Sequence, residues 1–586
     1  MSLDSTAATA LRHEGERSGR YRSAAIAVLR ILAGGGGWAL FAAVLLVPVL
    51  GFLSVAVSPR LFDQGDAWFT LDTLRSVCSG WTARALVDTF LVGVCAAAVA
   101  VVVGGWLAWV LERTTLPGRP LFRLLLWALL LAPSYLESLG WTWLVEKYGV
   151  LEKLTGQDLH AVRAVVLGPA GVSWVLATRG IPFAVLSISA MLRSMGREYT
   201  DAARTHGAGR LAAARTVLPI LAPALWAGFA IVFAESISDY GVAATMGTAA
   251  HFPLATAAMY QAIGTFPADF GTAAAVGWLL MALVALAIAV QRRATRTGSY
   301  AVLSGRTRPA TRVRLRGPAA AGALAATSLV FLLAVGVPVL GAVLASFLPS
   351  GPGAGASVSL ANYRHVLAGD SLWAPLRYSA ELAAVVACAA VVFGSIAGRS
   401  LARGSARLLD LLLLAAIALP SVLLASGYIF TYDLPQVAAL GLDIYGTVWL
   451  LMLGYLAGAL PKSARLLSAA MSQINDNIVT AARVHGAAPV TAWVRGVLPL
   501  LATPLLWVWL VTFADTVFEF PISQMLAPPG GRPLSVEITR HLEGYDFGGG
   551  GALTVLAMGI VLLLIGAVLI GARLVLPTGR GLEGLR

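Results

Sequence analysis

One seven-residue pattern occurs twice in this chain. Ala-Ala-Arg-x-His-Gly-Ala occupies Ala202–Ala208 and again Ala481–Ala487, so that its two glycines are separated by nearly half of the chain. In both places Val-Leu-Pro follows, at Val217–Pro219 and Val497–Pro499, and opens a new apolar run. A polar motif repeated at this spacing predicts two homologous halves, each of which presents the same feature to a partner.

The apolar composition of the chain indicates that both halves lie in a membrane. Hydrophobic residues make up 58% and charged residues 12% of the 586 residues, and the mean hydropathy is +0.80. A helix needs about 20 mostly apolar residues to cross a bilayer. The segments of that kind are centred near Val44, Ala100, Leu130, Val175, Ala227, Leu283, Leu332, Val386, Leu414, Leu451, Trp509 and Leu562. We therefore predict an all-α polytopic membrane protein, with about 12 transmembrane helices that form two parallel six-helix repeats.

The net charge of +13 raises the question of a nucleic-acid partner. The basic residues, however, gather in every second loop, for example from Arg193 to Arg215 and from Arg292 to Arg316. The intervening loops are neutral, acidic or mixed. This alternation is the positive-inside pattern, which predicts cytoplasmic N and C termini. It favours the lipid bilayer over nucleic acid as the partner of the basic residues.

The repeat and the charge pattern together divide the chain into five parts. We expect short cytoplasmic tails at 1–23 and 577–586. The first half is predicted at 24–290 and the second at 318–576, and an arginine-rich cytoplasmic linker joins them at 291–317. The repeated motif falls in cytoplasmic loops at about 193–219 and 473–499.

The repeated motif has a physical interpretation as the end of a short helix. Glycine readily adopts the left-handed backbone conformation that terminates a helix, so Gly207 and Gly486 are predicted to end one in each loop. The alanines before them allow close approach of another backbone. An interhelical packing corner is the alternative interpretation, but two equivalent cytoplasmic copies favour a docking surface.

At these residues the chain resembles the inner-membrane permease subunits of binding-protein-dependent ABC importers. The mark of that family is Glu-Ala-Ala, three residues, Gly, nine residues and Ile-x-Leu-Pro, in the loop that docks into the ATPase subunit. The matching residues are Asp201, Ala202, Ala203, Gly207, Leu218 and Pro219 in the first half, and Thr480, Ala481, Ala482, Gly486, Leu498 and Pro499 in the second. Thr480 replaces the acidic residue, which implies unequal docking at the two loops.

The resemblance implies which partners this chain has. Two docking loops imply two copies of a separate ABC ATP-binding subunit, and the family also works with an extracytoplasmic solute-binding protein. The expected location is the bacterial inner membrane. Fused halves are similar to the subgroup that imports ferric iron, thiamine and related solutes; a polyamine or a phosphonate is an alternative.

The chain itself shows no catalytic pattern. It lacks the Gly-x-x-x-x-Gly-Lys-[Ser/Thr] loop that binds ATP phosphates. Its seven histidines are scattered, with no nucleophile–base or metal-ligand spacing. We therefore predict no catalytic residue, no metal ligand and no cofactor in this chain, and a membrane enzyme is disfavoured.

A second paired feature concerns the solute. Glu235 and Asp239 recur as Asp515 and Glu519, at one and the same offset along the chain, toward the outer ends of two equivalent spans. Acids at membrane depth are costly and usually face a bundle interior or a water-filled path. These four carboxylates predict a path for a cation, with ferric iron ranked first; hydrated helix ends are the alternative. An ion-coupled secondary transporter is a rival function, but it needs no doubled docking loop, and its coupling acids are expected near the midplane.

Overall fold

The protein is a bundle of helices. The computed structural model describes most of the chain. The described residues are 46–196, 205–207, 209–296, 312–351, 355–404, 407–417, 419–475 and 477–575. Within these ranges the backbone forms helices and turns, with one isolated bridge between Thr114 and Val313. The all-α class predicted from the sequence is confirmed. Both predicted tails lie outside the described residues.

Eight helical segments are long and apolar enough to cross a membrane. They are α4 (Gly80–Arg113), α9 (Pro169–Ser194), α11 (Arg210–Ser238), α13 (Phe270–Arg296), α14–η3–α15 (Pro318–Phe331, Leu332–Gly336, Val337–Phe347), α17 (Asp370–Ala402), α24 (Leu498–Val517) and α27 (Phe547–Val575). Helix α21 (Val448–Met471) lies at another predicted span. The first predicted span lies partly outside the described residues and continues as the apolar helix Leu46–Val55. The number twelve stays a prediction.

The third predicted span of each half is broken. Helix α5 (Arg119–Leu131) meets the segment Ser134–Thr155, which begins with helix α6 (Ser134–Val145), at an angle of 98°. In the second half, α18 (Arg407–Ile417) and α19 (Ser421–Tyr432) are separated at the equivalent place. Pro133 and Pro420 cap the second helix of each pair, and a residue that precedes proline is disfavoured in the α conformation. The spans predicted near Leu130 and Leu414 are thus each built from two helices, and the recurring Pro-Ser marks the break between them.

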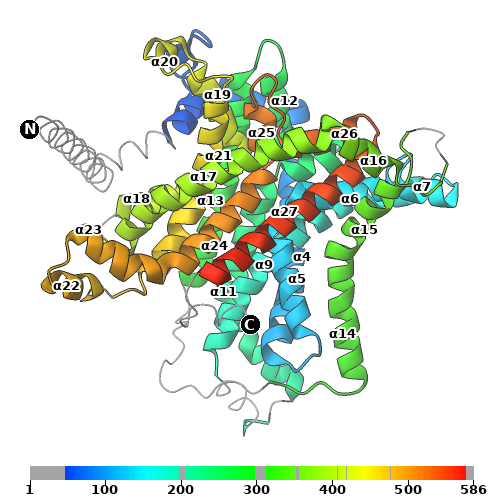
Figure 1. Cartoon of the computed structure of the whole chain (residues 1–586). Coiled ribbons are helices and arrows are strands. Elements are labelled where there is room, and N and C mark those ends of the chain that lie inside the picture. Colours follow the sequence, from blue (N-terminus) through cyan, green and yellow to red (C-terminus); the bar gives the residue numbers. More distant parts are fainter. Residues whose placement is uncertain are drawn as a thin grey trace, which may run out of the picture.

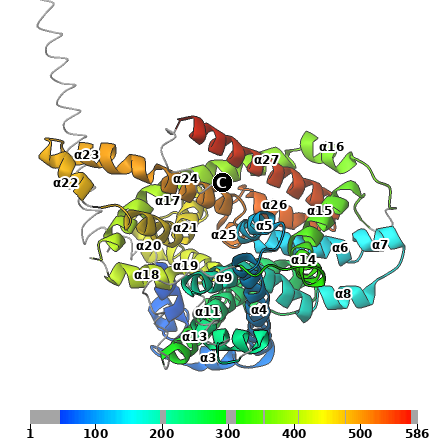
Figure 2. The same cartoon turned by 90° about the horizontal axis from the view of Figure 1, so that it is seen from below.

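The same helix pairs pack in the two halves (Figures 1 and 2). Helix α4 packs along α9, as α17 packs along α21. Small residues allow this approach: a Cβ on Gly398 would lie 2.8 Å from the backbone nitrogen of Ser468. Close contact between backbones is the usual way in which membrane helices associate.

The halves also exchange contacts. Helix α15 of the second half packs on α6 of the first, and a Cβ on Gly140 would overlap the carbonyl of Pro338. Reciprocally, the helix Leu46–Val55 packs on α19, where a Cβ on Gly427 would lie 2.8 Å from the carbonyl oxygen of Pro48. The leading helix of each half therefore rests on the broken span of the other.

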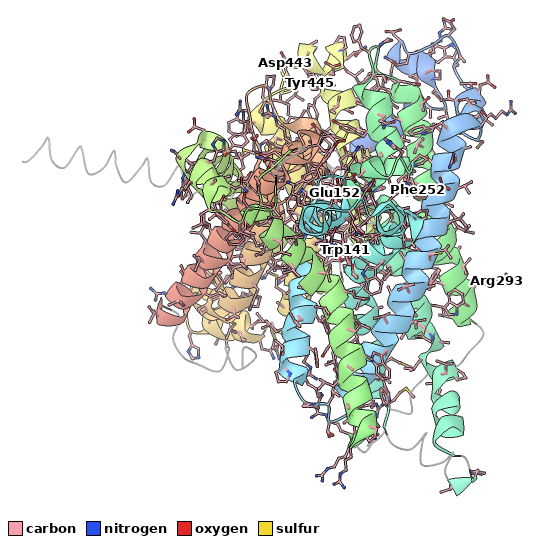
Figure 3. All side chains as sticks on the ribbon, turned by 90° about the vertical axis from the view of Figure 1, so that its right-hand side faces the viewer. Trp141, Glu152, Phe252, Arg293, Asp443 and Tyr445 are labelled. Carbon is pink, nitrogen blue, oxygen red and sulfur yellow. The ribbon has the colours of Figure 1, made fainter. Side chains whose placement is uncertain are left out.

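The acidic loop before α21 and the basic end of α13 lie at different levels of the bundle (Figure 3). Figure 3 shows Asp443, in the loop between α20 (Pro435–Ala439) and α21, at the top of the molecule, and Arg293 of α13 well below it. Helix α13 continues to Arg296 and so enters the predicted linker. The far end of that linker is also ordered, since the Val313 amide donates to the Arg113 carbonyl at 2.7 Å.

Candidate functional site

A cavity lies between the two halves, where the broken spans meet the ends of α11 and α24. Its volume is about 210 Å³. Ser134 and Ser421, the first residues after the two breaks, both line it. The sequence-predicted acids Glu235, Asp239, Asp515 and Glu519 line the same cavity. The fold thus brings together four carboxylates from equivalent segments of the two halves.

In the first half the two acids have different roles. Glu235 lies within α11, but that helix ends at Ser238 and Asp239 follows as its C-cap. The carboxylate of Asp239 accepts a hydrogen bond of 2.8 Å from the amide of Val242. Asp239 therefore holds the turn that follows α11, while Glu235 remains on the helix.

The second half repeats this division. Asp515 lies within α24, whereas Glu519 comes after its end. The carboxylate of Glu519 accepts hydrogen bonds from the amides of Ile522 at 3.0 Å and Ser523 at 2.9 Å. These amides belong to the first turn of α25 (Pro521–Leu526), where an acid is favourable. In both halves, therefore, the first acid lies on the helix and the second lies beyond its end, so the two acids of a pair do not share one helix face.

Two basic residues in the cavity were not foreseen. Lys462 lies within α21, and its Nζ is 3.3 Å from Oδ2 of Asp515. Arg179 lies within α9 and donates hydrogen bonds to the carbonyls of Leu130, at 3.0 Å, and Ala132, at 2.6 Å. An arginine inside an apolar helix is rare, so the sequence did carry a signal for Arg179.

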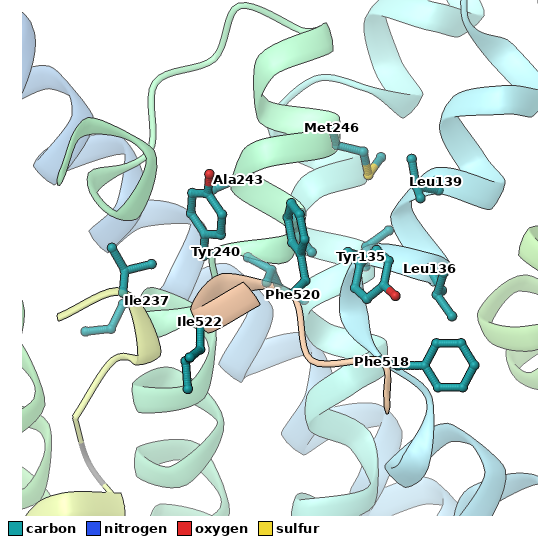
Figure 4. Packing of buried hydrophobic residues seen from close by; sticks show 14 of the residues in the cluster. Tyr135, Leu136, Leu139, Ile237, Tyr240, Ala243, Met246, Phe518, Phe520 and Ile522 are labelled. Atoms are coloured by element: carbon teal, nitrogen blue, oxygen red, sulfur yellow. The ribbon is translucent and has the colours of Figure 1, made fainter. Parts of the chain in front are cut away.

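Aromatic rings close one end of this cavity. Tyr240 and Phe520 directly follow the two capping acids, and their rings stack with centroids 5.5 Å apart. Tyr135 extends the layer, with its ring centroid 5.1 Å from that of Phe520. Figure 4 shows Phe520 between Tyr240 and Tyr135. Because Tyr240 and Phe520 each follow an equivalent acid, the contact joins equivalent positions of the two halves.

A second cavity is lined by part of the same aromatic layer. Its volume is about 480 Å³, and it shares Tyr240 and Phe520 with the first cavity. Glu146, Glu543 and Tyr260 line it. The hydroxyl of Tyr260 accepts a hydrogen bond of 3.0 Å from the side-chain amide of Gln524. The two cavities are therefore adjacent compartments with one aromatic partition. We call the first the inner cavity, because α11 and α24 reach it from the side of the repeated motif, and the second the outer cavity.

No ready-made metal site accompanies these acids. Within the described ranges, no three His, Cys, Asp or Glu side chains are grouped so that they could hold a metal ion. Among the described residues, the acids of the inner cavity therefore do not present a coordination shell of that kind. The absence of metal ligands from the whole chain stays a prediction.

The second copy of the repeated motif forms an exposed helix end. Helix α22 (Asn477–Val484) is followed by Gly486, whose φ is +85°. The Gly486 amide donates to the Arg483 carbonyl, and the Ala487 amide donates to the Ala482 carbonyl, each at 3.0 Å. This pair of bonds is the Schellman motif, which requires a left-handed residue at the glycine. The left-handed conformation predicted for Gly486 is present.

This loop is attached to the bundle by a small apolar cluster of its own. Met471, Val497 and Leu501 form the cluster, and Val479 of α22 packs against it. One π-helical turn, Trp493–Val497, leads from the loop into α24, in which Pro499 occupies the first turn. A force on α22 would therefore be transmitted to α21 and α24, the helices that carry Lys462 and Asp515.

The first copy of the motif is described in part. Asp201, Ala202 and Ala203 lie outside the described residues. Gly207 has a φ of +79°, so its predicted left-handed conformation is also present. Leu218 and Pro219 lie within α11, which runs unbroken from the loop to the inner cavity.

Comparisons with known proteins agree on one kind of protein. Residues 390–577 match the family described as binding-protein-dependent transport system inner membrane component. A probable ABC transporter permease protein, y4fN of Sinorhizobium fredii, is 26% identical over 523 residues, which cover 84% of this chain and 87% of that protein. The ferric transport system permease protein FbpB of Actinobacillus pleuropneumoniae is 22% identical over 525 residues, or 87% of this chain and 74% of that protein. The sulfate transport system permease protein CysT of Salmonella typhimurium is 35% identical over 141 residues, or 24% of this chain and 50% of that protein.

Proposed function

We propose that this chain is an inner-membrane permease subunit of a binding-protein-dependent ABC transporter, and that its cavities form the import path of a small cationic solute, with ferric iron as the first candidate. The charge of the inner cavity carries this proposal. Its described lining holds four carboxylates and two bases, Arg179 and Lys462. An excess of acids in a partly water-excluded site attracts cations.

The relatives support ferric iron among cations. Two proteins similar to this chain are named as ferric transport permeases, one of them over 525 residues. Thiamine and a polyamine are the cationic alternatives. A loosely held path suits any of these solutes, because a permease has to release its solute as well as accept it.

An oxyanion such as sulfate is the second candidate. Arg179 and Lys462 both line the cavity, and the sulfate permease CysT is similar to about a quarter of the chain. A phosphonate belongs to the same anionic class. Arg179 already donates to two backbone carbonyls and Lys462 to Asp515, so both bases have partners without an anion.

The energy for import is proposed to come from two copies of a separate ABC ATP-binding subunit. The loops around Gly207 and Gly486 provide two docking places, and an extracytoplasmic solute-binding protein delivers the solute on the other side. In the second loop Val484 is 79% exposed, next to the left-handed Gly486. An ion-coupled secondary transporter remains the rival, and it predicts uptake by this chain without an ATPase.

The arrangement of the cavities indicates how solute would move. Closure of the ATPase subunits would pull on α22, and α24 would pass that movement to Asp515 and the aromatic layer. Separation of Tyr240 from Phe520 would join the two cavities and let solute pass from the outer to the inner one. When the rings stack again, solute in the inner cavity is separated from the outer one.

Neutralising the helix-borne acids tests the cation path. In cells that carry the complete transporter, Glu235→Gln and Asp515→Asn are expected to slow uptake of radiolabelled ferric iron, while co-purification of the ATPase is retained. The effect should shrink at high salt if the attraction is long-range. Asp239→Asn is the comparison variant, because it neutralises an acid of the same cavity that caps a turn and does not lie on the helix. Unchanged ferric uptake in both variants and in their double variant would refute the cation path, and faster sulfate uptake would favour the anionic candidate.

A further inference from the structure

We propose that Lys462 is a built-in counter-ion of the inner cavity: it neutralises Asp515 when the cavity is empty and is displaced by an incoming cation. This inference rests on the proposed import of a cationic solute. It assigns to Lys462 a role in setting solute affinity and release.

The geometry of the pair suits reversible exchange. Nζ of Lys462 lies 3.3 Å from Oδ2 of Asp515, and the two side chains are 59% and 51% exposed. Both side chains therefore face the cavity and are not packed into the core. A solute cation of equal or higher charge that enters the cavity can reach the Asp515 carboxylate and compete with the ammonium group for it.

The other charged groups of the cavity do not share this property. Arg179 donates to the carbonyls of Leu130 and Ala132 at the broken span, so it supports the backbone. Asp239 and Glu519 accept hydrogen bonds from backbone amides, which fix their carboxylates in place. Glu235 forms no ion pair with the part of the chain that the structure describes. Of the two described bases that line the cavity, Lys462 is thus the one that pairs with a carboxylate of the proposed solute path.

The position is also asymmetric between the halves. At the offset that relates Pro182 to Pro461, Lys462 corresponds to Phe183. The first half therefore supplies no ammonium at this position, and the charge of Lys462 acts on Asp515 and also on Glu235. A solute cation would compete with Lys462 for Asp515, which provides a means of release.

The chain offers a matched control pair on the same helix. Arg465 is 2.7 Å from Asp410, and the two side chains are 37% and 47% exposed. Neither residue lines the cavity. Arg465→Met removes a comparable ion pair of α21 without changing the charge of the solute path.

Terbium(III) provides a direct test on the purified full chain. It is a redox-inert cation that prefers oxygen ligands, and tyrosine can sensitise its luminescence; Tyr135 and Tyr240 line the cavity. Lys462→Met removes one positive charge next to the bound ion. The terbium concentration that gives half-maximal luminescence should therefore be about three- to tenfold lower in this variant than in the wild type. Lys462→Arg and Arg465→Met should keep the wild-type midpoint.

Transport by the complete assembly gives the second readout. Lys462→Met should lower both the KM and the kcat of ferric iron uptake, because the cation is held more tightly and released more slowly. An unchanged midpoint in Lys462→Met, while Glu235→Gln with Asp515→Asn weakens terbium binding, would overturn this inference and leave the cation path standing. If that double variant leaves terbium binding intact and Lys462→Met raises the KM for sulfate, the cation path itself fails.

Discussion

The left-handed glycine of the second repeated motif allows a sharp test of the proposed coupling to the ATPase. Gly486 has a φ of +85°, and a Cβ built on it would have no atom within 4 Å. The Cβ of a replacement valine would therefore meet no other atom of this chain. What it adds is backbone strain of about 1–2 kcal/mol, the usual cost of a left-handed L-residue. Such a cost disfavours the docked loop conformation by a factor of about 5–30.

The loss should be local to the loop. The cluster around Met471, Val497 and Leu501, on which α22 packs, is separate from the main apolar core of the described residues. The melting temperature of Gly486→Val should therefore stay close to that of the wild type. Transport-coupled ATP hydrolysis and co-purification of the tagged chain with its ATPase should both fall, with the native complex as reference.

A second glycine controls for strain alone. Gly441, in the loop between α20 and α21, has a φ of +76° and also has no atom within 4 Å of a built Cβ. Gly441→Val should carry the same strain and leave ATP hydrolysis unchanged. Gly486→Asn should be milder than the valine variant, because asparagine tolerates the left-handed region. If Gly486→Val hydrolyses ATP, binds the ATPase and imports solute as the wild type does, the docking assignment is wrong.

Three further predictions concern other parts of the molecule. Phe520→Ala should open the aromatic layer and permit uptake that no longer depends on ATP, which a flux assay in ATP-depleted vesicles would detect. Gly140→Ala should lower the melting temperature, because its Cβ would overlap the Pro338 carbonyl and a forced backbone shift costs about 1–3 kcal/mol. Burial raises the pKa of the Asp546 carboxyl, but hydrogen bonds from His541 and other neighbours outweigh burial and lower that pKa below its ordinary value. Since the folded pKa is depressed, this carboxyl stabilises the folded state above the unfolded pKa of about 3.9. The stabilisation is lost as pH falls toward the folded pKa. The difference in melting temperature between Asp546→Asn and wild type should therefore be constant above about pH 5 and shrink in more acidic buffer.

The sequence by itself determined the features that depend on short stretches of chain. Apolar length predicted membrane helices, and left-handed glycines were predicted at Gly207 and Gly486. These features follow from backbone preferences and transfer free energies, which act within a few residues. The repeat spacing also identified two equivalent sets of acids, and their part in solute transport stays a prediction.

Only the tertiary structure decided which side chains meet. Lys462 and Asp515 are 53 residues apart in the chain, and their contact depends on how α21 and α24 are rotated toward each other. Asp239 and Glu519 serve as caps because their helices end just before them, which helix periodicity did not predict. The stacking of Tyr240 on Phe520 requires both halves to meet at one axis. Such contacts arise from three-dimensional packing between distant segments, about which local sequence patterns carry no information.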